Sequence, residues 1–150
     1  MNTIFIYYSY TGNGDVLAKA FEEKGIETRK LKPKKTLPKS FFFGMLAGGF
    51  RAWSKSKDVL IGFDDDIASF DHIILGSPIW NGRVSCPMNG ALSRLDLAKK
   101  KVTFLFYSGS GEGKKALARI QKQYPSAEIL FLQEPKKYPE QLTKIEGLLA

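Results

Sequence analysis

The segment SYTGNG, from Ser9 to Gly14, has the residue types of a phosphate-binding loop. Ser9 and Thr11 supply hydroxyl groups, and the backbone N–H groups of a loop that enters a helix attract anions. The loop has no lysine, and its glycines lack the spacing of an NTP-binding P-loop or a dinucleotide-binding fingerprint. It therefore predicts a cradle for a single phosphate group, with an ordinary capped turn as the alternative. The candidate ligands are Ser9, Tyr10, Thr11, Gly12, Asn13 and Gly14.

Two later segments have features that suit a planar ligand. GSPIWNG, from Gly76 to Gly82, sets a large flat ring, Trp80, beside a flexible Asn-Gly pair, although a Trp anchored in the core is the alternative. SGSGEG, from Ser108 to Gly113, has glycines that let a ligand approach the backbone, although alone it is better explained as a flexible turn before a helix. The candidate residues here are Pro78, Ile79, Trp80, Asn81, Gly82, Ser108, Gly109 and Ser110.

Other residues that could do chemistry are sparse. His72 is the only histidine, and we expect it at the start of a strand rather than as a base or ligand. Cys86 is the only cysteine, so no internal disulfide can form and a buried, inert thiol is expected. The run from Asp64 to Asp66 lacks EF-hand spacing and suits a solvated turn. We predict no catalytic side chain and no metal ligand.

Apolar strands and amphipathic helices alternate along the chain. Strands are predicted at 3–8, 27–31, 72–76, 102–107 and 129–132, and helices at 15–23, 88–97, 113–124 and 139–149, with Gly25 as the stop of the first helix. This alternation predicts an α/β fold, a doubly wound parallel sheet of five strands in the order 2-1-3-4-5 with helices on both faces. Ligands of such sheets bind outside the carboxyl ends of the strands, where the three candidate segments fall.

The 150 residues are expected to form one domain, 1–150, with a basic, aromatic-rich insertion at about 33–57 that contains a helix from Ser40 to Trp53. Between Arg29 and Lys57 there are nine basic residues and no acidic ones. Such a field attracts anionic partners, and a face that only improves solubility is the alternative. No export signal and no apolar stretch of the ~20 residues that span a bilayer is found, so we expect a cytoplasmic protein.

In its three candidate segments the sequence resembles the flavodoxin family, and the resemblance covers most of the chain. It implies noncovalent FMN, with the phosphate on Ser9, Thr11, Gly12, Asn13 and Gly14. The flavin ring would lie against Trp80, with Asn81 and Gly82 near its redox-active edge and Ser108, Gly109 and Ser110 on the other side. The family commonly closes the phosphate loop with Thr or Ser, whereas Gly14 stands here and Asp15 follows at once.

The function that the resemblance implies is electron transfer by a noncovalent flavin, with the protein tuning the cofactor. A small FMN-dependent reductase of quinones or similar acceptors is the first alternative. The second is a binding protein of this fold that uses its basic segment on an anionic partner. We expect a redox partner protein, with an acidic surface, or a small-molecule electron acceptor; nucleic acid is not an expected partner. The oligomeric state is left open.

Overall fold

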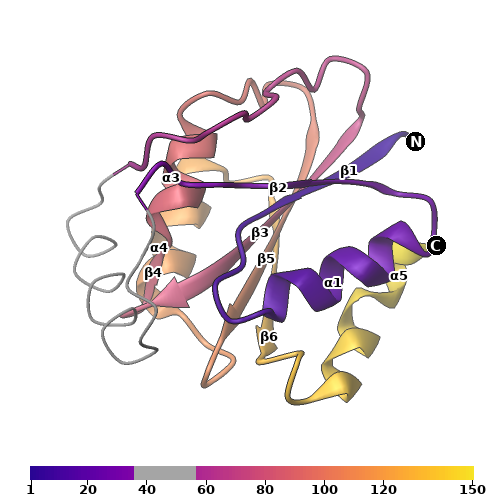
Figure 1. Cartoon of the computed structure of the whole chain (residues 1–150), viewed down its shortest axis with the longest axis vertical. Coiled ribbons are helices and arrows are strands. Elements are labelled where there is room, and N and C mark those ends of the chain that lie inside the picture. The colour runs from indigo at the N-terminus through magenta and orange to yellow at the C-terminus, as the bar shows by residue number, and fades with distance from the viewer. Residues whose placement is uncertain (36–56) are drawn as a thin grey trace.

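The computed structural model describes residues 1–35 and 57–150, and in this part of the chain a parallel sheet forms the centre (Figure 1). The sheet order is β2-β1-β3-β5-β6, and a short strand, β4, pairs with β3 outside this path. The strands are β1 (Thr3–Tyr7), β2 (Glu27–Lys30), β3 (His72–Trp80), β4 (Arg83–Val84), β5 (Lys101–Ser108) and β6 (Glu128–Gln133). The five paired strands of the main path are parallel, so the predicted fold class and strand order are confirmed.

Helices cover both faces of this sheet (Figure 1). They are α1 (Asn13–Glu22), α3 (Cys86–Leu92), α4 (Lys114–Gln123), the 3-10 helix η1 (Pro139–Ile145) and α5 (Glu146–Leu149). Along β1, Ile4 and Ile6 pack in the cluster that includes α3 and α4, whereas Phe5 and Tyr7 pack in the cluster that includes α1. Successive side chains of a strand point to opposite faces, so a strand between two layers needs the continuous apolar run seen here.

Strand β3 is longer than predicted, and this changes the nature of one candidate segment. It spans nine residues that are all buried, so Gly76 to Trp80 form a strand and not a loop. Its ladder with β5 continues as far as Pro78, which pairs with Tyr107, and its end pairs with β4. The Gly, Ser and Pro residues predicted a break, but the neighbouring strand supplies the pairing that keeps the segment extended. The true turn is at Asn81 and Gly82, both at positive φ (53° and 75°), as a tight hairpin requires.

Local hydrogen bonds determine where helices α1 and α3 end. Helix α1 begins at Asn13 rather than Asp15, and Gly25 ends its last turn at φ +74° with the Ile26 N–H bonded to the Phe21 carbonyl at 3.1 Å. This is the predicted glycine stop in a Schellman-type geometry. Helix α3 ends at Leu92, before the predicted residue 97, where the Ser93 hydroxyl donates to the Gly90 carbonyl at 2.7 Å and competes with a further turn.

The remaining predicted helices differ in outcome. Helix α4 lies within the predicted range 113–124. The C-terminal segment is a 3-10 helix from Pro139 to Ile145 followed by one short α-helix, where a single α-helix was predicted. Bonds between residues three apart, such as Gln141 N–H to the Tyr138 carbonyl at 3.0 Å, hold this tighter winding. The helix predicted from Ser40 to Trp53 lies outside the described residues. Among the helices that the structure describes, none combines the length and the apolar composition of a membrane span.

Candidate functional site

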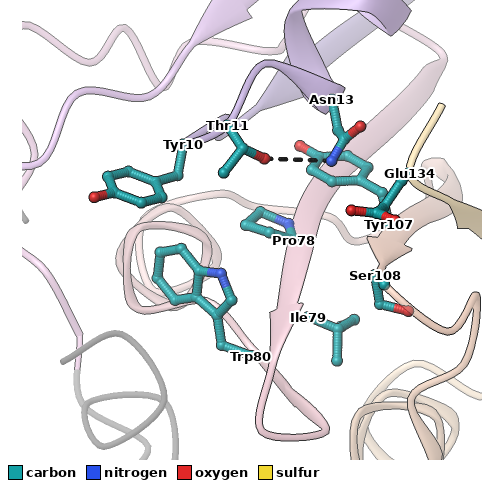
Figure 2. Close-up of a pocket in the computed structure, with 10 residues that line it drawn as sticks. Tyr10, Thr11, Asn13, Pro78, Ile79, Trp80, Tyr107, Ser108 and Glu134 are labelled. Atoms are coloured by element: carbon teal, nitrogen blue, oxygen red, sulfur yellow. Dashed lines mark hydrogen bonds between the residues drawn. The ribbon is translucent and has the colours of Figure 1, made fainter. Parts of the chain in front are cut away.

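The three candidate segments meet at one pocket, at the carboxyl ends of β1, β3 and β5 (Figure 2). The pocket has a volume of about 110 Å³, and a neighbouring cavity of about 290 Å³ shares Thr11, Asn13 and Glu134 with it. Tyr10 and Trp80 lie on one side of the pocket, and Glu134, Tyr107 and Ser108 on the other. The lining residues are Tyr10, Thr11, Asn13, Pro78, Ile79, Trp80, Tyr107, Ser108, Gly109 and Glu134.

The loop after β1 has the geometry of an anion cradle. Gly12 is the N-cap of α1 at φ +100° and provides no capping side chain, and the first N–H groups of a helix have no partner within the helix. The buried Ser9 hydroxyl accepts the Gly14 N–H at 3.1 Å, which holds the loop in a tight curve. Thr11 presents its hydroxyl beside Asn13, which donates to it at 3.3 Å. A helix start fits a phosphate because its first N–H groups point out of the helix, and here hydroxyl groups lie nearby.

Gly14 is fixed by close packing. A Cβ atom at this position would lie 2.6 Å from the Tyr107 hydroxyl, 2.8 Å from the Tyr7 ring and 2.9 Å from the Ser9 Cβ. The Tyr107 hydroxyl is itself held by donating to the Tyr8 carbonyl, and burial raises the pKa of Tyr107 well above its usual value, so the proton stays in place. The loop therefore has no room for the Thr or Ser that the flavodoxin pattern commonly has here.

Asp15 points away from the cradle. Its carboxylate accepts hydrogen bonds from the Lys30 ammonium at 2.7 Å and from the Tyr7 hydroxyl at 3.1 Å. Burial and the nearby Asp15 carboxylate raise the pKa of Tyr7, which keeps that hydroxyl protonated as a donor. The negative charge is thus paired on the β2 side of α1, where it does not occupy the N–H groups of the loop.

Trp80 serves the core and the pocket at once. It is 8% exposed, and its ring meets Tyr8 and Tyr10 edge to face, with centroid distances of 5.8 and 6.0 Å. Because Trp80 is the last residue of β3, the strand fixes its position at the pocket (Figure 2). The two interpretations of this residue, a core anchor and a surface for a planar ring, are therefore compatible.

Several predicted residues lie near the pocket without lining it. Ser9, Gly12 and Gly14 belong to the loop itself: Gly12 is the N-cap of α1, and the Ser9 hydroxyl accepts the Gly14 N–H. Asn81 and Gly82 form the hairpin turn, where the Gly82 carbonyl accepts the Ala116 N–H at 2.8 Å. Ser110 is absent from the lining.

The sequence prediction missed the lining residues Tyr107 and Glu134. Tyr107 was interpreted only as the last apolar residue of the strand predicted at 102–107. Glu134 directly follows β6, whose carboxyl end reaches the same edge of the sheet, and that position was the one available signal.

The other candidate residues have structural roles. His72 is the first residue of β3, the position predicted for it. It is buried, and its ring Nε2 lies 2.8 Å from the Thr103 hydroxyl. Burial, followed by the charge of Lys101, lowers the pKa of His72. Cys86 is buried at the start of α3. The exposed run from Asp64 to Asp66 makes local turn contacts, and within residues 1–35 and 57–150 no cluster of side chains could hold a metal ion.

Comparison with known proteins gives a family match. The model of the family described as NADPH-dependent FMN reductase matches residues 11–134. No curated protein matches the chain.

Solved structures share the fold. A protein assigned as a flavoprotein from Bacteroides uniformis is 24% identical, with a TM-score of 0.73 over 88% of this chain and 90% of that chain. A flavoprotein from Lactobacillus acidophilus, solved in complex with FMN, is 17% identical, with a TM-score of 0.71 over 93% and 97%. An NADPH-quinone reductase from P. pentosaceus is 9% identical, with a TM-score of 0.57 over 100% and 98%. At these identities the likeness shows the fold.

Proposed function

The chain belongs to the NADPH-dependent FMN reductase family, and from this premise we propose that it is a small FMN-dependent reductase that takes electrons from NADPH and passes them to a quinone or similar acceptor. The family match over residues 11–134 is the observation that carries the proposal, and it confirms the expectation of a flavodoxin-like protein with FMN as its cofactor. The sequence alone favoured an electron carrier; the reductase was its first alternative.

The residues of the pocket suit the parts of the cofactor. The N–H groups at the start of α1, with Ser9 and Thr11, would hold the phosphate. Trp80 and Tyr10 offer aromatic surface to a planar ring at the other side of the pocket and shield it from water. When bound, FMN supplies the redox chemistry, and the protein contributes binding, orientation and the local electrostatic field. This proposal needs no side chain as a catalytic acid or base, and the absence of such a residue stays a prediction from the sequence.

The overall reaction balances without a metal or a further reductant. NADPH, one proton and a quinone give NADP⁺ and the hydroquinone: the nicotinamide gives up a hydride, and the acceptor gains two electrons and two protons. The test is steady-state oxidation of NADPH by FMN-loaded protein with a soluble quinone, compared with free FMN at the same concentration. We expect turnover well above that of free FMN.

The two alternatives predict different results in the same assay. An electron carrier would bind FMN and accept electrons from a separate reductase, but would not oxidise NADPH by itself. A protein that does not bind FMN in an absorbance titration would contradict the proposal altogether. The third possibility is binding of an anionic partner through the nine basic residues between Arg29 and Lys57, of which Lys39, Arg51 and Lys55 lie outside the described residues.

A further inference from the structure

Lys136, in the turn that follows β6, lies across the phosphate-binding loop at the other end of the sequence. Its backbone N–H donates to the Asn13 side-chain oxygen at 3.0 Å, and its ammonium donates to the Thr11 carbonyl at 3.2 Å. A Cβ atom added to Gly12 would lie 3.1 Å from both the Cδ and the Nζ atoms of Lys136. The lysine side chain is therefore packed directly on the loop.

The Lys136 ammonium forms no salt bridge with the residues that the structure describes. Its ammonium bonds to a neutral carbonyl, and the salt bridges of residues 1–35 and 57–150 do not include it. Lys136 also lines the cavity of about 290 Å³ that shares Thr11 and Asn13 with the flavin pocket. A cation thus lies at the edge of an open cavity beside the anion cradle, with the Glu134 carboxylate lining the same cavity.

The cradle itself is short of charge for its ligand. A phosphate monoester carries about −1.5 to −2 at pH 7, whereas a helix N-terminus is equivalent to about +0.5. The segment from Ser9 to Gly14 contains no basic residue. The packing of Tyr107, Tyr7 and Ser9 around Gly14 excludes the hydroxyl that would otherwise close the loop.

We propose that the Lys136 ammonium is a phosphate ligand of the flavin site, supplied from the C-terminal part of the chain to compensate for the hydroxyl that Gly14 cannot carry. The residue lies beyond the family match, which ends at 134. Lysine is a common point-charge partner of phosphate. The inference rests on the proposed function, because it takes the phosphate of FMN as the anion.

The test compares Lys136→Met with Lys136→Arg and with a matched control, Lys144→Met. Lys144 is a suitable control because its ammonium also donates to a backbone carbonyl, that of Phe131 at 3.1 Å, and it does not line either cavity. Affinities for FMN and riboflavin are measured by fluorescence titration of the apoprotein. Riboflavin lacks only the phosphate, so a change confined to FMN reports on the phosphate contact.

We expect Lys136→Met to weaken FMN by about 10- to 100-fold, the range for a lost hydrogen bond to a charged group, and riboflavin by less than about twofold. Lys136→Arg should recover most of the FMN affinity, and Lys144→Met should leave both affinities unchanged. The FMN affinity of Lys136→Met should also depend less on salt than that of the wild type. Equal losses for FMN and riboflavin, or no loss, would overturn the proposal, since the lysine would then only support the shape of the loop.

A second measurement separates this inference from the proposed function. Inorganic phosphate should raise the melting temperature of the wild-type apoprotein and of Lys144→Met, but not that of Lys136→Met. If the wild type bound neither flavin, the proposed function would fail, and this melting assay would still decide the role of Lys136. An equal phosphate shift in all three proteins, or no shift in the wild type, would count against an anion ligand at position 136.

Discussion

Gly14→Ala should damage the phosphate loop although it adds only one methyl group. The added Cβ would meet the Tyr107 hydroxyl at 2.6 Å, the Tyr7 ring at 2.8 Å and the Ser9 Cβ at 2.9 Å. The Tyr107 hydroxyl cannot move away freely, because its bond to the Tyr8 carbonyl holds it. Overpacking of this kind costs about 1–3 kcal/mol. If the whole cost appeared in cofactor binding, FMN affinity would fall by about 5- to 150-fold.

Gly14→Thr makes the prediction sharper, because it restores the hydroxyl that flavodoxin-type loops commonly carry. If the hydroxyl decided affinity, this variant would bind FMN more tightly than the wild type. Packing predicts the opposite, a loss at least as large as that of Gly14→Ala. In a Tyr107→Phe background the nearest clashing atom is gone, so Gly14→Ala should cost less there than in the wild type, which a double-mutant cycle measures directly.

Two assays check the reasoning: urea unfolding of the apoprotein and fluorescence titration with FMN. Gly147→Ala is the control, because a Cβ at Gly147 meets no atom within 4 Å and Gly147 does not line either cavity. The packing argument would be refuted if Gly14→Ala matched the wild type in both assays. It would also be refuted if the Tyr107→Phe background gave no relief, because the clash would then lie elsewhere.

Three further predictions concern residues around the pocket and in the sheet. Replacing Ser9 and Thr11 together by Ala should weaken FMN more than riboflavin in titration; equal losses would remove the phosphate from this loop. Trp80→Ala should weaken flavin binding by roughly 1–3 kcal/mol and relieve the quenching of flavin fluorescence, with Trp80→Phe intermediate; unchanged values would leave Trp80 as a core residue only. Because burial lowers the pKa of His72 in the folded state, the unfolded chain binds the proton more readily, so stability should fall as pH drops through the ordinary value of about 6.5. His72→Gln should lose that part of the pH dependence in urea unfolding at pH 7.5 and 5.5, and an unchanged slope would contradict the assignment.

The sheet could be predicted from the sequence because its signals are local. The run from Ile4 to Tyr7 is apolar at every position, as a strand covered on both faces must be. Gly25 ends α1 as predicted. The positive φ that favours glycine here comes from the local backbone geometry of the helix end, and no distant residue that the structure describes packs against Gly25. Strand β3 was predicted too short because Gly76 and Pro78 usually interrupt strands, and the pairing with β5 that overrides them is a tertiary effect.

The site was predictable only where it follows a strand directly. The loop from Ser9 to Gly14 was recognisable by residue type and by its position before a helix. Glu134 directly follows β6 and so offered this signal, whereas Lys136 offered none, because it reaches the loop through a turn that folds back onto it. The crowding around Gly14 was also out of reach, since Tyr107 approaches it from another strand.

The bond from the Lys136 N–H to Asn13 joins residues 123 positions apart, and this has a consequence for biosynthesis. The loop proposed to hold the phosphate leaves the ribosome well before the turn that lies across it. Contacts between such distant residues form late in folding, because the long intervening loop must close first. The candidate site is therefore completed only after β6 has added to the edge of the sheet. Nascent chains that stop before this strand would lack both Glu134, which lines the pocket, and Lys136, which lies on the loop.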